Sequence, residues 1–598
     1  MAVSTNCSAT EQVEITTKYS HQVEITKQDD TEAIEDGESV ASSGVLNVVV
    51  SGLGLFSDGY NAQISECTFG RNLLFSACLR SITNLSIRDE VGYMEPLFSV
   101  LYKNTMSSSI KTRLSNSFLI GEIFGMLFFG ALIDRVGRRT GVVATTSFLV
   151  LGIILSAAAH GTSELGMFWM MIVARGIAGF GAGGEYPVCA TSATEAADET
   201  ANLRKKRGFL VASTTDFAVD MGFVAAGIVA LIVLACFHQD IKSGVWRVCF
   251  GLGFVIPVFM CFFRIRMINS KQYRKHAIKS RYPYWLVLRR YWKPILGTSL
   301  AWFCYDFVTY PFGLFTSTII AQLSPNNTTV ENIGYGTVIN CFYLPGCLLG
   351  GLLMDKIGRK QNMTLGFVLW GVWGFILGGA LRPIQSVFPL FVVMYGIFNA
   401  LGEMGPGVST FLCAAESFPT PLRGHFLGLA AAVGKAGASI GTEVFTPIQN
   451  SFSSTEKGQQ AVFLIGSAFC MVGALIAWFL IPDMSRELET EDARFKAYLE
   501  ENGARGSPVR TIDQNPGGLI TAKYENVILV RRYITAIARL CLKVCMAGSY
   551  TPMRAALGVI AARERSLLST SSSSDESTVG GNGCGNIKTD QRLRAIVS

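Results

Sequence analysis

Residues 130–139 read GALIDRVGRR, and residues 351–360 read GLLMDKIGRK. Both copies hold glycine, aspartate, glycine and arginine at the same spacing, and each copy follows a long apolar run. A shorter match, the dipeptide RG at 207–208 and again at 423–424, repeats at nearly the same separation. Membrane proteins are often built from two copies of one helical unit, and such a duplication would produce this pattern.

The composition of the chain indicates a membrane domain. Of its 598 residues, 49% are hydrophobic and only 16% are charged, with a mean hydropathy of +0.36. A membrane-crossing helix needs about 20 mostly apolar residues. Such runs lie near 45–65, 117–133, 141–160, 167–190, 208–236, 247–263, 295–321, 334–354, 363–381, 386–413, 424–446 and 460–481. They predict an all-α membrane protein with twelve transmembrane helices in two six-helix bundles, and they exclude an ordinary soluble domain.

Lysine and arginine gather in alternate loops between these runs. They occur around 135–139, 204–207, 264–293 and 356–360, whereas the loop 321–332 has none. The positive-inside rule places the basic loops and both termini in the cytosol. The net charge of +7 therefore reflects topology and contact with anionic lipid heads, and does not indicate nucleic-acid binding.

These patterns divide the chain into segments. Residues 1–44 are polar and acidic, which predicts a disordered cytosolic tail and no signal peptide. The further segments are an N-terminal bundle at 45–263, a basic cytosolic linker at 264–294, a C-terminal bundle at 295–482 and a partly disordered cytosolic tail at 483–598. Within the tail, 483–505 is expected to form an exposed charged helix, and 527–547 a helix on the inner membrane surface.

One segment does not fit the duplication. If Asp58 in the first run is equivalent to Asp306 in the seventh, they are separated by more residues than the two repeated loops are. The extra residues of the first half fall at 66–91. This segment is either an insertion or an artefact of the sequence.

The repeated loops resemble the signature of the major facilitator superfamily, which implies that fold. Asp134 and Arg138 in the first copy, and Asp355 and Arg359 in the second, lie at cytosolic helix ends. Such charges can pair between helices in one state and separate in another, so we expect them to form a gate. A loop that only sets topology would explain the arginines but not the spaced glycines and aspartates.

Two motifs of soluble enzymes are false matches. Residues 174–188, ARGIAGFGAGGEYPV, match the glycine spacing of a dinucleotide-binding turn, and 437–441 match a hydrolase nucleophile elbow. Both motifs need a preceding strand, and each stretch lies inside an apolar helical run. The small residues are better explained by close helix packing in lipid. The 15 cysteines show no metal-type spacing. We therefore predict no catalytic residue, no metal site and no enzyme.

Ionisable residues inside membrane spans are costly and mark functional sites. In the seventh run, Trp302, Asp306 and Tyr310 recur every four residues and share one helix face, which predicts the wall of a polar cavity rather than plain aromatic packing. Lys435, deep in the eleventh run, suits either a structural ion pair with Asp306 or a point charge for an anionic phosphate.

A closer resemblance rests on six short stretches. GEYP at 184–187, WFCYDFVTYP at 302–311, ESFPTPLRG at 416–424 and VGKAGA at 433–438 resemble the phosphate:proton symporter branch of the superfamily. GEMGPG at 402–407 and GTEVFTPI at 441–448 are most similar to its glycerophosphodiester permeases, including the glycerophosphoinositol transporters.

That resemblance implies roles for particular residues. The substrate phosphate would be held by Tyr186, Trp302, Asp306, Tyr310 and Lys435. Proton movement would involve Asp58, Glu185 and Asp306.

Two positions depart from the inorganic-phosphate carriers, which have glutamine and asparagine where this chain has Asp220 and Gly407. We expect Gly407 to open volume beside the phosphate, and Asp220 to accept hydrogen bonds from hydroxyl groups of a larger substrate. The sequence thus predicts a monomeric, proton-driven importer of glycerophosphodiesters such as glycerophosphoinositol in the plasma membrane, with no other cofactor. The alternatives are an inorganic phosphate:proton symporter, a phosphate sensor that does not transport and, least favoured, a membrane-embedded phosphodiesterase.

Overall fold

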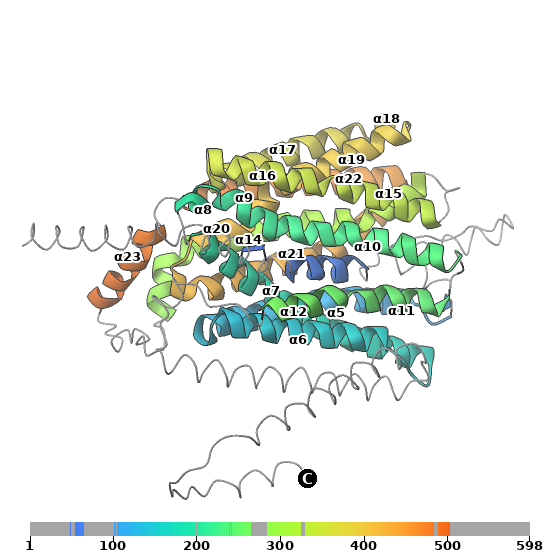
Figure 1. Cartoon of the computed structure of the whole chain (residues 1–598). Helices are drawn as coiled ribbons and strands as arrows, with labels where there is room; N and C mark the ends of the chain where they lie inside the picture. The colour runs from blue at the N-terminus through green and yellow to red at the C-terminus, as the bar shows by residue number, and fades with distance from the viewer. Residues whose placement is uncertain are drawn as a thin grey trace, which may run out of the picture. The chain divides into compact units, whose positions relative to one another are not determined.

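The described part of the chain is helical. The computed structural model describes residues 48–49, 54–64, 98, 101–102, 104–198, 201–238, 240, 242–264, 284–323, 329–483 and 488–502. No strand occurs within these ranges, and the long helices run nearly side by side (Figure 1). The predicted all-α fold is therefore confirmed.

The helices follow the predicted runs. A helix over 54–64 covers the described part of the first run. The rest of the N-terminal half is α5 (Ser108–Val136), α6 (Arg138–Ala157), α7 (Glu164–Ala197), α8 (Ala201–Lys205), α9 (Arg207–Thr214), α10 (Asp216–Cys236), α11 (Ser243–Leu252) and α12 (Val255–Arg264). The C-terminal half is α14 (Tyr284–Leu323), α15 (Thr329–Cys341), α16 (Tyr343–Ile357), α17 (Arg359–Gly379), α18 (Leu381–Gln385), α19 (Phe388–Gly402), the π-helix η1 (Glu403–Gly407), α20 (Val408–Glu416), the short 3₁₀ turn η2 (Thr420–Leu422), α21 (Arg423–Asn450) and α22 (Thr455–Leu480).

Most of these helices satisfy the requirements for crossing a bilayer. Within the described ranges, nine helical segments are long and apolar enough to span a membrane. The helices α14 and α21, which hold Asp306 and Lys435, cover the seventh and eleventh predicted runs. The segment 66–91 lies outside the described residues, as do most of the two tails.

The backbone conformation of the repeated loops requires glycine at one position in each. Gly137, between α5 and α6, has a φ of 95°, and Gly358, between α16 and α17, has a φ of 98°. Residues with a side chain rarely adopt this conformation, so each loop needs glycine to reverse the chain between two long helices. Equal angles at equivalent positions show that the two halves build this corner in the same way.

The glycine-rich stretch at 174–188 forms the middle of α7, with no strand before it. A Cβ at Gly179 would overlap the backbone oxygen of Phe118 on α5, and one at Gly181 would overlap the backbone of Leu149 on α6. These glycines therefore let α7 lie against two helices at backbone contact distance, as small residues do in lipid. The nucleotide-binding interpretation has no structural basis.

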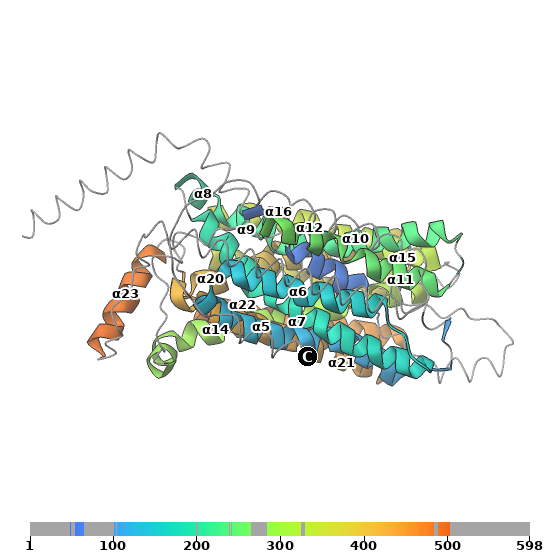
Figure 2. The same cartoon turned by 60° about the horizontal axis from the view of Figure 1, so that its bottom comes forward.

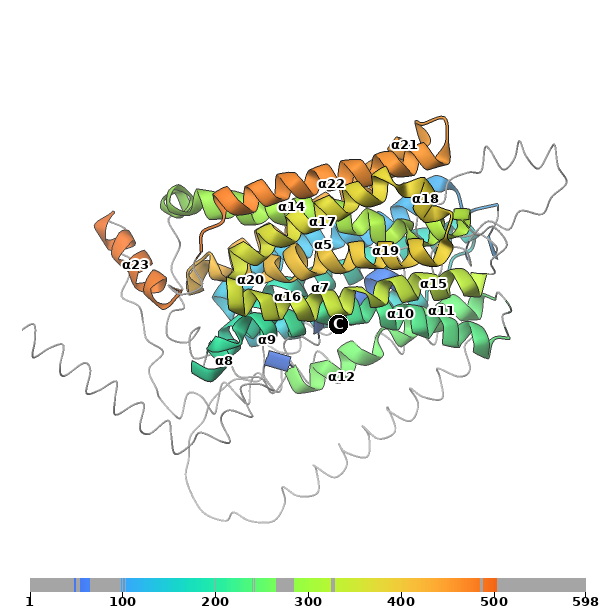
Figure 3. The same ribbon diagram turned by 90° about the horizontal axis from the view of Figure 1, so that it is seen from above.

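The two halves meet mainly along three pairs of helices. Helix α5 packs against α21, and α9 and α10 pack against α16 and α15. At one crossing, a Cβ at Gly130 would lie 2.8 Å from the backbone oxygen of Gly424. Figure 3 shows α14, α17 and α22 side by side within the C-terminal half, in agreement with their contacts.

The two ends of the bundle differ in charge. We call the end that carries the corners at Gly137 and Gly358 the basic end. Helices α8, α20 and α23 (Leu488–Glu501) lie at that end, and α11 and α15 reach toward the other (Figure 2).

Helix α23 corrects one expectation. It forms within the predicted range 483–505, but only one side of it is exposed. Phe495 is 1% exposed and packs with Tyr291 and Phe418, whereas Asp492 accepts hydrogen bonds of 2.8 Å from both the backbone nitrogen and the hydroxyl of Thr420. One face of α23 is thus fixed to the C-terminal half near the start of α21.

Close glycine packing leads to a test on α7. A Cβ at Gly183 would overlap the backbone oxygen of Glu122, which cannot move without shifting α5. We expect Gly183→Ala to destabilise the fold by about 1–3 kcal/mol, seen as a lower Tm of the purified protein in detergent. Gly251→Ala is the matched control because nothing lies within 4 Å of the added carbon. Equal melting of both variants would contradict the packing argument.

Candidate functional site

Lys435 lies at the centre of the described core. Its side chain on α21 is 3% exposed, and its ammonium lies 3.8 Å from Oδ2 of Asp306. The ammonium donates a hydrogen bond to the Tyr310 hydroxyl and lies over two aromatic rings, 4.0 Å from the centroid of Tyr310 and 4.9 Å from that of Tyr186. A buried cation is thus held by one carboxylate and the faces of two tyrosines.

The spacing of residues on α14 produces this arrangement. Trp302, Asp306 and Tyr310 lie one turn apart on the helix face that packs against α21. The Trp302 ring lies against Gly434, where a Cβ would come within 2.5 Å of the indole. Glycine before Lys435 therefore allows the tryptophan to lie beside the cation.

The N-terminal half contributes acidic groups to the same region. Asp58 is 1% exposed, and its carboxyl lies beside the side chains of Tyr186 and Glu122 and within electrostatic reach of Lys435. Glu185, next to Tyr186 on α7, points the other way, toward α6, and accepts hydrogen bonds from Thr146 at 2.9 Å and Thr145 at 3.2 Å. The structure therefore places the buried Asp58 within electrostatic reach of the lysine, whereas Glu185 lies in an adjoining polar cluster with Thr145 and Thr146.

Phe411 on α20 joins the two halves of this site. Its ring stacks on Tyr186, with centroids 5.5 Å apart and an angle of 18°, and meets Trp302 edge-on at 4.9 Å. The sequence analysis missed this residue, because a phenylalanine in an apolar run carries no signal that separates it from ordinary packing. Only the contact across the halves identifies it.

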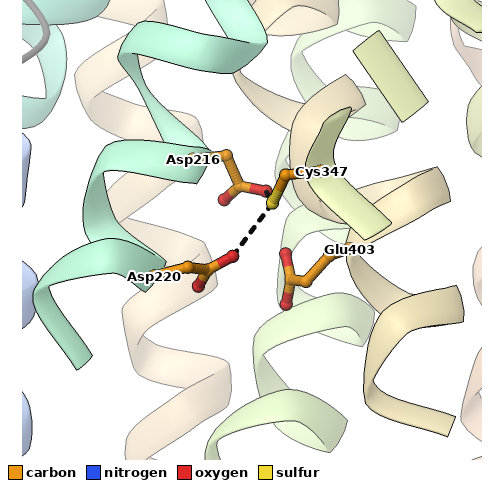
Figure 4. A group of neighbouring side chains, drawn as sticks. All are labelled: Asp216, Asp220, Cys347 and Glu403. Atoms are coloured by element: carbon orange, nitrogen blue, oxygen red, sulfur yellow. Dashed lines mark hydrogen bonds between the residues drawn. The ribbon is translucent and has the colours of Figure 1, made fainter. Parts of the chain in front are cut away.

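A second group of buried polar side chains lies between α10, α16 and η1. Figure 4 shows Asp216 and Asp220 from α10 facing Cys347 from α16 and Glu403 from η1. The Cys347 thiol donates to Asp220 at 2.9 Å and to Asp216 at 3.4 Å. We call these four residues the acidic cluster, and their ligand-type atoms all lie within 4.8 Å of one another.

The acidic cluster cannot carry three full charges. Carboxyl oxygens of Asp216, Asp220 and Glu403 lie within 4.8 Å of one another, and the Tyr305 hydroxyl lies within hydrogen-bond distance, 2.7 Å, of both oxygens of Glu403. In the low dielectric of a protein interior, neighbouring carboxylates resist simultaneous ionisation. The cluster can therefore hold protons, and its oxygen and sulfur atoms are also a donor set that a cation could use.

Two predictions about this region need correction. A Cβ at Gly407 would overlap Oε2 of Glu403 and lie 2.8 Å from Oδ2 of Asp216, so the carboxyl groups fill the space that we expected to be open. Asp220 lies with Cys347 in the acidic cluster, and its expected contact with substrate hydroxyl groups stays a prediction. The expectation of no metal-type grouping also rested on sequence spacing, which cannot reveal residues brought together from distant helices.

The predicted gating residues lie where the halves meet at the basic end. Asp134 accepts hydrogen bonds from the backbone nitrogens of Gly424 at 3.3 Å and His425 at 2.9 Å, at the start of α21. Arg138 pairs with Asp134 at 2.6 Å and with Glu195 of α7 at 2.7 Å. A carboxylate at a helix N-terminus stabilises the helix, and here it also joins the two halves at the basic end.

The second copy forms the mirrored junction. Asp355 accepts hydrogen bonds from the backbone nitrogens of Gly208 at 2.8 Å and Phe209 at 2.9 Å, at the start of α9. Arg359 lies 3.6 Å from Asp355 and 3.3 Å from Glu416, the same acid that pairs with Arg207 at 2.6 Å in the other half. Each half therefore presents an aspartate to a helix start of the other.

The chain is similar to a known protein family and to characterised permeases. The family described as sugar (and other) transporter matches residues 84–282 and 284–493. The chain belongs to this family. It is 35% identical over 465 residues to glycerophosphoinositol permease 1 of Candida albicans, covering 77% of this chain and 83% of the relative. It is also 35% identical over 484 residues to the glycerophosphocholine permease GIT4 of the same organism, covering 79% and 86%.

A solved structure shows the same fold. The proton:xylose symporter XylE, a major facilitator superfamily protein bound to 6-bromo-6-deoxy-D-glucose, superposes with a TM-score of 0.60 and 17% identity, covering 76% of this chain and 99% of the symporter. The predicted major facilitator fold of twelve helices in two bundles is thereby confirmed. This transporter is a multi-pass membrane protein and not an enzyme.

The glycine in the acidic cluster offers a test of its geometry. We expect Gly407→Ala to lower the Tm of this transporter in detergent, because the added methyl displaces the Glu403 carboxyl from its hydrogen bonds. Gly379→Ala, where nothing lies within 4 Å, is the control. Adding Glu403→Asp to Gly407→Ala shortens the acid and should restore part of the loss; no recovery would mean that the contact with Glu403 is not the cause.

Proposed function

We propose that this chain is a proton-coupled importer of glycerophosphodiesters such as glycerophosphoinositol, working by alternating access in the plasma membrane. The observation that supports it most is the position of Lys435, a buried cation between the tyrosines of both halves with Asp306 beside it. A phosphodiester carries one negative charge at neutral pH, which suits a single lysine. The names of the relatives, permeases for glycerophosphoinositol and glycerophosphocholine, support the same substrate class.

The phosphate would replace Asp306 as the partner of Lys435. The hydroxyl groups of Tyr186 and Tyr310 and the indole of Trp302 surround that position and can donate to phosphate oxygens. Arrival of the anion removes the cation that compensates the Asp306 carboxylate. Since a buried carboxylate without a partner is costly, Asp306 would then take up a proton, and substrate and proton would bind together.

Further protons are needed for uptake of an anion. A membrane potential of 100 mV contributes about 2.3 kcal/mol per elementary charge, so import gains from the potential only if more than one proton enters per negative charge. The proposed sites for these additional protons are Asp58, beside Tyr186, and Glu185, which points from α7 toward α6. The gradient of protons is the proposed driving force, with no other cofactor.

The head group would lie toward the acidic cluster. Asp216 is within electrostatic reach of both Lys435 and Asp306, so the cluster adjoins the proposed phosphate position. Carboxylates accept hydrogen bonds from hydroxyl groups. Glycerol and inositol carry several hydroxyl groups, whereas inorganic phosphate carries fewer. This favours a phosphodiester over the alternative of inorganic phosphate.

Alternating access requires one set of contacts between the halves to open at a time. The junctions at Asp134 and Asp355 close the basic end, and a hydrogen bond from Asn116 on α5 to Glu443 on α21 joins the halves elsewhere along the same helix pair. We assign the basic end and both termini to the cytosol, because its loops carry the excess of lysine and arginine. The proposed site lies within one chain, as a monomer requires.

A competition experiment tests the substrate. Vesicles or cells that contain the transporter should accumulate labelled glycerophosphoinositol intact, and unlabelled glycerophosphocholine should compete more strongly than inorganic phosphate. Accumulation also separates transport from sensing, and recovery of intact substrate separates it from hydrolysis. Preferential competition by inorganic phosphate would favour the alternative symporter.

Proton coupling is tested at Asp306. We expect Asp306→Asn to abolish accumulation driven by a pH gradient, because the amide cannot take up a proton when the anion binds Lys435. Exchange of labelled for unlabelled substrate without a gradient reports whether the variant still binds and moves substrate. Gradient-driven accumulation at the level of the unchanged protein would remove Asp306 from the mechanism.

A further inference from the structure

The two junctions at the basic end differ in one side chain. Each consists of an aspartate that accepts hydrogen bonds from two successive backbone nitrogens of the opposite half, at Gly424 and His425 in one junction and at Gly208 and Phe209 in the other. The duplication therefore places His425 and Phe209 at equivalent positions. One of the two junctions has a titratable ring where the other has an apolar one.

The imidazole of His425 takes part in the contact between the halves. Its Nδ1 lies 2.6 Å from Oδ2 of Asp134, whose side chain is fully buried, and the histidine side chain is 10% exposed. Arg138 pairs with the other oxygen of Asp134, Oδ1. The His425 ring therefore contacts one oxygen of Asp134 across the interface, and Arg138 contacts the other.

Charged groups of both signs lie around His425. The titratable and charged groups around it come from α5, α6, α7, α14 and its own helix, and are Asp134, Arg138, Glu195, Tyr284 and Arg423. Arg423 lies 3.7 Å from Glu195, and the Tyr284 hydroxyl lies 3.5 Å from Nε2 of His425. Among these groups, two arginines face two acids, and a protonated imidazole adds one positive charge.

We propose that His425 is a positioning residue that makes opening of the basic end depend on the pH on that side. An unperturbed imidazole changes charge between roughly pH 5 and 8. When the ring is protonated, its hydrogen bond to Asp134 is charge-assisted and about twice as strong as the neutral one. The protonated form therefore holds Asp134 against α21 and keeps the halves together at the basic end.

The consequence concerns the rate of release and not the chemistry of the substrate. A transporter that brings protons to the side of its basic end would slow its own opening there as that side becomes acidic. The inference rests on membership of the transporter family and on the contact between the halves. It stands or falls independently of which substrate is carried.

A distance measurement tests the proposal without any substrate. Spin labels at Thr140 on α6 and Trp285 on α14, both exposed at the basic end and in opposite halves, would be introduced into a cysteine-depleted protein in lipid. We expect the population with the longer distance to rise about fivefold or more from pH 5.5 to pH 8. Any pH response that belongs to other carboxyl groups is common to all variants.

The duplication supplies matched variants. His425→Phe copies the equivalent junction, and His425→Gln keeps a neutral donor in case the phenylalanine variant does not fold; both should lose the pH-dependent part of the distance change. Phe209→His should add a second pH-dependent contact at Asp355 and sharpen the response. A pH response in His425→Gln equal to that of the unchanged protein would overturn the proposal, and so would a flat response in the unchanged protein.

Discussion

A charged group buried away from water needs a partner of opposite charge. The arrangement of side chains at the centre of this transporter follows from one such buried charge. The Lys435 ammonium lies in the middle of α21, where it is compensated by Asp306 and by the faces of Tyr186 and Tyr310. Burying an ion pair offers little net stability compared with apolar packing, because desolvation offsets most of the attraction. Such a pair is what the proposed mechanism requires, in which an external anion takes the place of the Asp306 carboxylate.

The sequence predicted this pair because its signals are local. Charges inside apolar runs stand out, and a spacing of four places Trp302, Asp306 and Tyr310 on one helix face. The same is true of the fold, since apolar runs of 20 residues and a duplicated corner leave few architectures. The twelve helices and the turns at Gly137 and Gly358 could be inferred without coordinates.

Other features depend on contacts that spacing does not encode. In the sequence, Gly407 suggested open volume beside the substrate. In the structure, a π-helical turn at Glu403–Gly407 brings the Glu403 carboxyl against Gly407, and α10 adds the carboxyl of Asp216. Cys347 gives no indication of its role until α16 is placed beside α10. Helix α23 is rich in charged residues, and its buried side combines Phe495 with acids that accept hydrogen bonds, such as Asp492 with Thr420.

The stacking of Phe411 on Tyr186 has an implication for affinity. The tyrosine belongs to the N-terminal half, whereas the phenylalanine and the neighbouring Trp302 belong to the C-terminal half. A relative rotation of the halves would slide these rings past each other and change how firmly the Tyr186 hydroxyl is aimed at the centre. In the proposed mechanism, the affinity for substrate therefore depends on the relative orientation of the two halves, because each half supplies some of the rings around Lys435.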